Sequence, residues 1–223
     1  HRVVVIDTDI GLRNLDVIMG LENRIVYDLV NVIEGSCKLH QAMIHDKSKH
    51  ELYLIPAAQT REKSCIEPEQ LRELCAKLEN EFDYVLMDCP AGIEQGFKNA
   101  VAAASEAILV TTPEVSSIRD ADRVIGLLEA SDLHRPKLII NRINPAMVRQ
   151  GNMMDQRDIV DLLAVDVIGL VPVDDRTITA ANRGVPVVHD KKAPAGAAFL
   201  RIAARVDGDE VPLMEMEYRS SLM

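Results

Sequence analysis

The chain has 223 residues, of which 48% are hydrophobic and 27% charged, and its formal net charge at pH 7 is −10. This composition is that of a globular protein with a sizeable aliphatic core. The acidic balance argues against a large nucleic-acid surface, because phosphates require a basic stripe. The sequence contains no run of roughly twenty apolar residues that could span a membrane. Its four cysteines lack C-x-x-C spacing, which indicates a reduced cytoplasmic protein.

Short apolar runs alternate with helical patterns along the chain. Six runs are predicted to be buried strands, namely residues 3–6, 52–55, 84–87, 107–110, 138–140 and 167–171. Four stretches carry apolar residues at helical spacing, namely residues 68–78, 117–129, 155–163 and 195–206. This alternation predicts an α/β fold in which a mainly parallel sheet has helices on both faces. Ligands of such sheets bind beyond the carboxyl ends of the strands.

Asp88 directly follows the apolar run 84–87. A carboxylate at the end of a buried strand is costly unless a positive or donating group meets it. In phosphate-binding folds that partner is hydrated Mg²⁺. Gly92, four residues on, would let the backbone approach a phosphate closely. The alternative is that Asp88 caps the next helix or turn.

Asp7 and Asp9 form a second pair of carboxylates at the end of the run 3–6. Alternate residues of an extended segment point the same way, so both side chains can face one site. One could approach a metal shell while the other orients water for attack on phosphorus. The alternative is a loop with exposed acids. The presence of Asp88 at another strand end favours the functional interpretation.

An ordered series of segments resembles the MinD family of septum site-determining ATPases, which are deviant P-loop ATPases of the ParA/MinD type. The segments are DTDIGLRNLD at 7–16, DCPAGIE at 88–94, PEVSSIRDADR at 113–123, NRINP at 141–145, ANRG at 181–184 and PV at 186–187. The resemblance extends from His1 to about Leu213. It implies a P-loop NTPase-like fold, an ATPase activity with ATP and Mg²⁺ as cofactors, and a homodimer around two ATP molecules.

The resemblance also implies roles for the acids. Asp88 would hold Mg²⁺ through water, Asp7 would support the metal shell and Asp9 would position the attacking water. Gly92 would sense the γ-phosphate. The catalytic and metal residues are therefore expected at two strand ends.

The nucleotide base would be bound further along the chain. By resemblance, Asn141 with Arg142 would meet the adenine, and the alternative is that Asn141 caps the end of a strand. The loop that closes over base or ribose would consist of Pro172, Val173 and Asp174.

A charged helix is the expected binding site for protein partners. By resemblance, it binds the division inhibitor MinC and the activator MinE, with Asp120 and Asp122 as the principal contacts. A solvated helix face is the alternative for these acids. The expected partner-binding residues are Arg119, Asp120, Asp122 and Arg123.

Two family features have no counterpart in these residues. No G-x-x-x-x-G-K-[ST] stretch occurs between His1 and Met223. We therefore expect the first strand, the P-loop and the first helix of the fold to be missing from this sequence. We also expect that residues 1–223 alone neither bind nor hydrolyse ATP measurably, because nothing neutralises the triphosphate.

The second feature is a C-terminal amphipathic helix that lies on anionic membranes. Such a helix needs an apolar face and basic flanks. Here residues 201–223 contain three Arg and five acids, and Pro212 interrupts any long helix. We expect this membrane helix to be missing as well, with the membrane a partner of the full-length protein. Residues 1–206 are expected to form a single nucleotide-binding domain, and residues 207–223 a flexible tail.

The leading hypothesis is therefore an ATP-dependent, membrane-cycling regulator of division-site placement, cytoplasmic and peripheral to the inner face of the membrane. A bacterial cytosol and a plastid both fit. A ParA-like DNA-partition ATPase shares the fold, but the charge of −10 disfavours it. A non-enzymatic remnant that only binds partners is the other alternative. No nucleic acid is expected as a partner.

Overall fold

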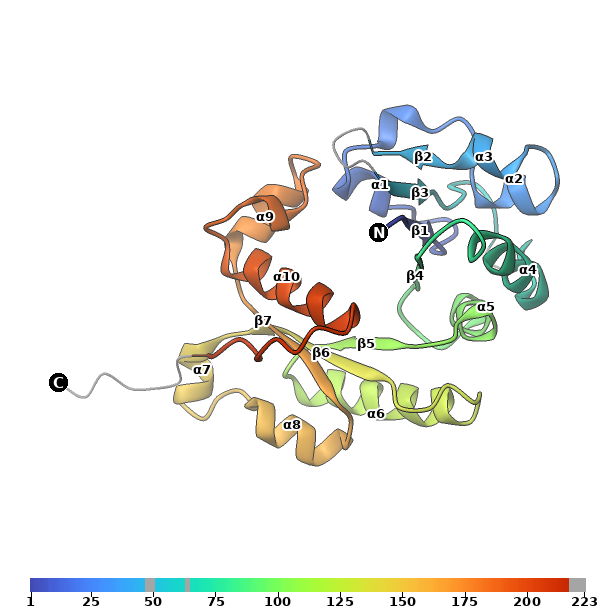
Figure 1. Cartoon of the computed structure of the whole chain (residues 1–223). Coiled ribbons are helices and arrows are strands. Elements are labelled where there is room, and N and C mark those ends of the chain that lie inside the picture. The colour runs from blue at the N-terminus through green and yellow to red at the C-terminus, as the bar shows by residue number, and fades with distance from the viewer. Residues whose placement is uncertain (47–50, 63–64, 217–223) are drawn as a thin grey trace. The chain divides into compact units, whose positions relative to one another are not determined.

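The computed structural model describes residues 1–46, 51–62 and 65–216 (Figure 1). The chain divides into two compact units. The first consists of His1–Ser105 together with Arg183–Val185, and the second of Glu106–Asn182 together with Pro186–Met223. The expected single domain 1–206 stays a prediction.

A four-stranded sheet lies at the centre of the first unit. Its order is β2 (Ile44–His45), β3 (Leu52–Ile55), β1 (Val3–Asp7) and β4 (Tyr84–Asp88). β1 pairs in parallel with β3 and β4, whereas the short β2 is antiparallel to β3. The carboxyl ends of β1 and β4 therefore lie side by side.

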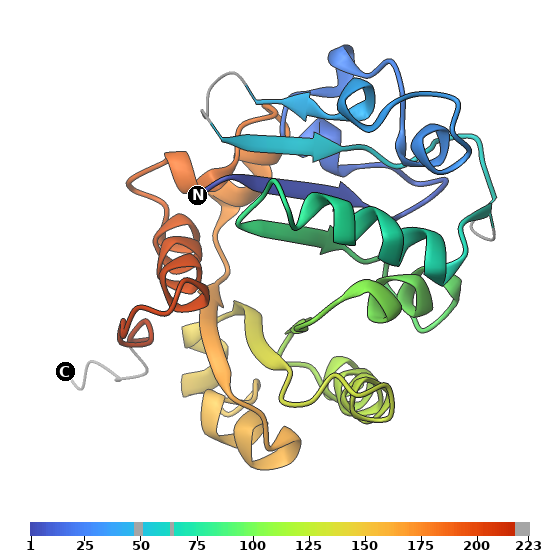
Figure 2. The same ribbon diagram turned by 45° about the vertical axis from the view of Figure 1, so that its right-hand side comes forward.

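Both faces of this sheet are covered. Side chains from alternate β1 positions, Val4 and Ile6, pack in one apolar cluster with α2 (Leu29–Ile33) and α4 (Pro68–Leu78). Val5 points to the opposite face, where it packs with Leu15, Met19 and Leu21. These residues belong to or flank α1 (Leu15–Ile18), which is followed by η1 (Glu22–Arg24). Figure 2 shows α4 and α5 (Gln95–Ala103) running close together along the unit, and α3 spans Leu39–Ala42.

The second unit contains a parallel sheet in the order β5 (Ile108–Thr111), β6 (Lys137–Ile143) and β7 (Val167–Pro172). One face packs against α6 (Val115–Glu129) and α8 (Gln156–Leu163). The other packs against α10 (Pro194–Val206), and Figure 1 shows α10 on the side of the strands away from α6 and α8. The shorter elements are α7 (Pro145–Arg149), α9 (Asp175–Ala181) and η3 (Val187–His189).

The predicted fold class is confirmed: the strands are mainly parallel and helices cover both faces. All six predicted strands and all four predicted helices are present, with ends shifted by up to three residues. The expectation that every strand is buried is wrong for two of them. Leu86 in β4 is 43% exposed, and Ile108 and Val110 in β5 are 41% and 57% exposed. The reason is that β4 and β5 each have only one paired neighbour in the described part of the chain.

The described part of the expected tail follows α10. Leu213 and Met216 pack against the α6–α8 side of the second sheet, and Met214 packs against the α10 side. Residues 217–223 lie outside the described residues. No helix in the described ranges is long and apolar enough to cross a membrane.

Two helical glycines provide a test of the packing in the second unit. A Cβ on Gly196 in α10 would lie 2.6 Å from the carbonyl oxygen of Val187, whereas one on Gly126 in α6 would meet nothing within 4 Å. Gly196→Ala is expected to lower the free energy of unfolding by about 1–3 kcal/mol through overpacking. Gly126→Ala should raise it by about 0.5–1 kcal/mol, because alanine favours a helix. Urea unfolding measures both, and stabilisation by Gly196→Ala would contradict the described contact.

Candidate functional site

The ends of β1 and β4 bring two acids together. Asp7 and Asp88 are direct partners in the parallel register. The next residue, Thr8, holds the ends of the two strands together. Its backbone N–H and its Oγ1 both donate to the Asp88 carbonyl oxygen, at 3.1 and 2.7 Å. Asp7 is only 1% exposed. The carboxylates that were predicted at two strand ends thus lie side by side in the first unit.

The environment of these acids resists negative charge. Burial raises the pKa of Asp7, and the charge of Asp88 raises it further, although the N–H groups of Asp9 and Leu15 act in the opposite direction. Burial also raises the pKa of Asp88, with the charge of Asp9 as the second cause. The Asp9 N–H donates to Asp7 Oδ1 at 3.0 Å. Within the described residues, the buried Asp7 Oδ2 has no hydrogen-bond partner.

A divalent cation fits this site. The donors are hard carboxylate oxygens, one of them buried and without a hydrogen bond, and a positive charge would relieve the repulsion that raises both pKa values. The described residues contain no cluster of three or more His, Cys, Asp or Glu side chains suited to a metal. A cation here would therefore keep several waters, as Mg²⁺ usually does.

The loop after the acids contains a buried ion pair that the sequence analysis missed. Arg13 Nε lies 3.0 Å from Asp16 Oδ2, with the side chains 12% and 1% exposed. Asp16 is in the first turn of α1, one residue after Leu15. The only sequence signal for the burial of Asp16 is that apolar residues flank it, Leu15 on one side and Val17 on the other. The sequence alone does not reveal that Arg13 is its partner.

Gly92 lies in the loop after β4, as predicted. Its φ is +99°, and a Cβ there would meet nothing within 4 Å, so backbone conformation rather than packing favours glycine. Beside Asp88, burial and the charges of Asp88 and Asp9 raise the pKa of the Cys89 thiol to about 11. Cys89 is therefore a neutral thiol at physiological pH and not an activated nucleophile.

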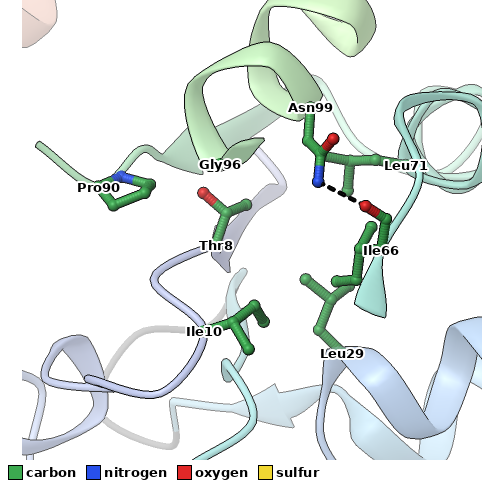
Figure 3. A pocket seen from close by; sticks show the side chains of 8 residues that line it. All are labelled: Thr8, Ile10, Leu29, Ile66, Leu71, Pro90, Gly96 and Asn99. Atoms are coloured by element: carbon green, nitrogen blue, oxygen red, sulfur yellow. Dashed lines mark hydrogen bonds between the residues drawn. The ribbon is translucent and has the colours of Figure 1, made fainter. Parts of the chain in front are cut away.

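A small cavity lies behind this loop (Figure 3). Asn99 of α5, buried at 4% exposure, donates from Nδ2 to the carbonyl oxygen of Ile66 at 2.8 Å. A Cβ on Gly96 would lie 2.6 Å from Pro90 Cγ, so α5 needs a glycine where it meets the loop. The cavity, of about 10 Å³, has room for roughly one water and none for a nucleotide. Its lining residues are Thr8, Ile10, Leu29, Ile66, Leu71, Pro90, Gly96 and Asn99.

The residues predicted to bind the base come together in the second unit. Asn141 and Arg142 are near the carboxyl end of strand β6, and the backbone N–H of Val173 donates to the Ile143 carbonyl at 2.9 Å. Asn141 Oδ1 accepts the Arg142 N–H at 2.9 Å, and Arg142 has a φ of +57°. The two predicted segments thus lie at adjacent strand ends.

The loop after β7 also has a structural role. Pro172 pairs with Ile143 at the end of the sheet, while Val173 is 48% exposed. Asp174 caps α9 by accepting the Arg176 N–H at 3.0 Å, and its other oxygen accepts the N–H of Ala195 at 3.2 Å. The loop is therefore anchored at Asp174 and presents Val173 to solvent.

The predicted partner-binding residues occupy the outer face of α6. Ile118, Ala121 and Ile125 point into the core, and the intervening charged residues are exposed. This exposed set comprises Arg119, Asp120, Asp122 and Arg123. These side chains have no ion pair in the described part of the chain.

Known proteins match this chain over almost its whole length. The AAA_31 family model, described as an AAA domain, matches residues 1–139. The septum site-determining protein MinD of Bacillus subtilis (strain 168) is 53% identical over 224 residues, which cover 100% of this chain and 84% of that protein. The chain belongs to the MinD family. MinD of Synechocystis sp. is 50% identical, with 96% of this chain and 81% of that protein covered.

Solved MinD structures share the fold. MinD from Aquifex aeolicus superposes with a TM-score of 0.87 at 44% identity, and the MinC:MinD complex of that organism with 0.90 at 46%. Each match covers 96% of this chain and 87% of the other. Pyrococcus horikoshii MinD, complexed with Mg-ADP, matches with a TM-score of 0.83 at 27% identity, covering 93% and 84%. The resemblance to MinD and the P-loop NTPase-like fold are thereby confirmed.

Neutralising Asp7 tests the electrostatics of the site. Because its pKa is raised on folding, Asp7 contributes stability that is fully present below the unfolded value of 3.8 and is lost as the pH rises through the raised value. Asp7→Asn at pH 7, without divalent cations, should therefore raise the free energy of unfolding by about 1 kcal/mol, or about 2–4 °C in Tm.

The gain should disappear near pH 3, where Asp7 itself is neutral. Asp161→Asn on the exposed face of α8 serves as the control, and it should change stability by less than about 0.5 kcal/mol at either pH. Thermal unfolding at the two pH values is the measurement. A loss of stability in Asp7→Asn at pH 7 would contradict the assigned repulsion.

Proposed function

We propose that this protein is an ATP-dependent regulator that places the division septum, and that Asp7 and Asp88 form its magnesium site. The observation that carries the proposal is the pair of carboxylates at adjacent strand ends, with Asp7 buried and Asp88 exposed, in a chain of the MinD family. The P. horikoshii relative complexed with Mg-ADP supports it. Bound Mg²⁺ would neutralise phosphate charge and stabilise the negative charge that develops on the transferred phosphoryl group.

The acids would divide the work between them. Asp88, at the exposed end of β4, would hold the waters of the cation, and buried Asp7 would orient that hydrated shell. Asp9 is partly buried, and its negative charge is the second cause of the raised pKa of Asp88. It would hold the attacking water in line with the phosphorus, a positioning role typical of phosphoryl transfer. Gly92, at a positive φ, would let the loop change conformation when the γ-phosphate leaves.

The base would be held by the second unit. Asn141 and Arg142, at the end of β6, would meet the adenine, and the loop from Pro172 through Val173 to Asp174 would cover base or ribose. Their placement at two adjacent strand ends supports this, since ligands of parallel sheets bind there.

The partners of the protein would include MinC and MinE. The A. aeolicus MinC:MinD complex is a relative with a TM-score of 0.90, which supports MinC as a partner. The exposed residues of α6, with Asp120 and Asp122 at its centre, would supply the contact. ATP would join two copies, and the dimer would double weak anchors on an anionic membrane until MinE stimulates hydrolysis. The protein would thus be cytoplasmic and peripheral to the membrane.

Substitution of Asp9 tests the catalytic assignment. Asp9→Asn in the complete native protein should lower the ATP turnover number by about 10²–10⁴-fold, because the attacking water loses its acceptor. The affinity for ATP should change by less than about threefold. Turnover is measured as phosphate release and affinity by calorimetry.

Asp161→Asn is the matched control and should leave turnover and affinity unchanged. Turnover that survives Asp9→Asn would remove Asp9 from the mechanism. Failure of the unsubstituted native protein to hydrolyse ATP would favour the non-enzymatic partner-binding alternative.

A further inference from the structure

The chain reverses its direction where α10 ends. Gly208 has a φ of +97°, and its N–H donates to the Arg205 carbonyl oxygen at 3.2 Å. The Asp209 N–H donates to the Ala204 carbonyl oxygen at 2.9 Å. These two bonds form a Schellman motif, which ends a helix and satisfies its last carbonyl groups. Residues 207–210 are exposed, and the chain then turns back past α10 (Figure 1).

Residues 211–216, which we call the strap, contact both faces of the second sheet. Leu213 and Met216 pack against the apolar cluster on the α6–α8 face, and Met214 packs against the cluster on the α10 face. Leu213 and Met214 are consecutive, and a backbone that lay over one face of the sheet would not place these neighbours on both. The strap therefore passes along an edge of the sheet.

That edge belongs to β7. Arg201 Nη1, on α10, donates to the Pro212 carbonyl oxygen of the strap at 3.1 Å. α10 itself lies against β7, where Arg205 Nη1 donates to the Ile168 carbonyl oxygen at 2.7 Å. In the described part of the chain, β7 pairs with β6 alone. The strap thus lies where a further strand beside β7 would be.

Side chains, and not a ladder of hydrogen bonds, hold the strap in place. Within the described ranges, no backbone hydrogen bond joins residues 211–216 to β7, and the bond from Arg201 to Pro212 is the one polar contact between the strap and the rest of the unit. The apolar side chains of Leu213, Met214 and Met216 are only partly buried. A segment with so few buried contacts should open at a lower free energy than the sheet that it covers.

An uncovered β7 edge would be a site for pairing with another chain. The unpaired N–H and C=O groups of an edge strand are a template for a further strand. Proteins block such edges with proline and charged side chains, and the strap presents Pro212 and Glu215 to solvent. A second copy of this chain has the same edge, so two copies can pair about a two-fold axis once the edge is bare.

We propose that the strap is an autoinhibitory cover of the β7 edge, and that its release lets a second copy of this chain pair with that edge. Arg201 and Leu213 hold the cover in place. This pairing is separate from the ATP-dependent joining of two copies in the proposed function, because it uses the second sheet alone and needs no nucleotide.

Release of the strap is tested first. Leu213→Ser with Arg201→Gln, the release variant, removes one apolar anchor and the hydrogen bond. Met214 and Met216 remain as reporters, and in the complete native protein without nucleotide hydrogen peroxide should oxidise both at least about threefold faster than in the unsubstituted protein. Mass spectrometry of peptides measures this. The Ile140 amide, buried in β6, should keep its hydrogen-exchange rate, whereas general unfolding would accelerate it.

Self-association is the second readout. With rising concentration, the release variant should form dimers or larger species, whereas the unsubstituted protein should keep the mass of a single chain without nucleotide. Light scattering after gel filtration measures the mass. A peptide of residues 208–216, added in excess, should return the variant to a single chain, because it covers the edge again. The same peptide with Leu213→Ser should have no effect.

Leu200→Ser with Arg157→Gln is the matched control, because both side chains are exposed on helices of the second unit. It should change neither oxidation nor mass. Unchanged oxidation in the release variant, a released strap without self-association, or association that the peptide does not reverse would overturn the proposal. If the release variant does not fold, Leu213→Ser alone, at a partly buried side chain, gives the same readouts. Because these measurements need no ATP, their failure is distinct from failure of the proposed function.

Discussion

The burial of the Asp7 carboxylate is the constraint on which the rest of the site depends. An ionised acid with 1% exposure, directly beside Asp88 in the strand register, is unfavourable unless charge or hydrogen bonds compensate it. The chain supplies the N–H of Asp9 to one carboxylate oxygen of Asp7, and the repulsion from Asp88 that remains is one that a bound cation would relieve. The parallel pairing of β1 with β4 makes the repulsion unavoidable, since it fixes both acids at one edge.

This constraint is consistent with the number of contacts that fix the segments next to Asp7 and Asp88. The Arg13–Asp16 ion pair and the bonds of Thr8 to the Asp88 carbonyl restrict segments that adjoin Asp7 or Asp88. A buried ion pair adds little net stability, because desolvation offsets its attraction. Its contribution here is to fix where α1 begins. In the second unit, one residue has two structural roles: Asp174 ends the proposed base-binding loop and caps α9.

The sequence predicted most where periodicity is strong. Six strands and the four helices α4, α6, α8 and α10 follow from apolar patterning. The interpretation of the strand-end acids follows from the rule that parallel sheets bind ligands beyond their carboxyl ends. Short elements such as α1 and α9 were missed, because four to seven residues carry too little periodicity, and the nine-residue helix α5 was not predicted either. The Arg13–Asp16 pair was missed because it depends on three-dimensional contacts.

Paramagnetic broadening by Mn²⁺, a substitute for Mg²⁺, tests the central claim most directly. The account predicts that increasing Mn²⁺ broadens first the backbone amide resonances beside Asp7 and Asp88 in the unsubstituted chain, and that Asp7→Asn weakens this broadening at both strand ends. Broadening that begins elsewhere, or that is identical in Asp7→Asn, would contradict a cation site built on these two carboxylates.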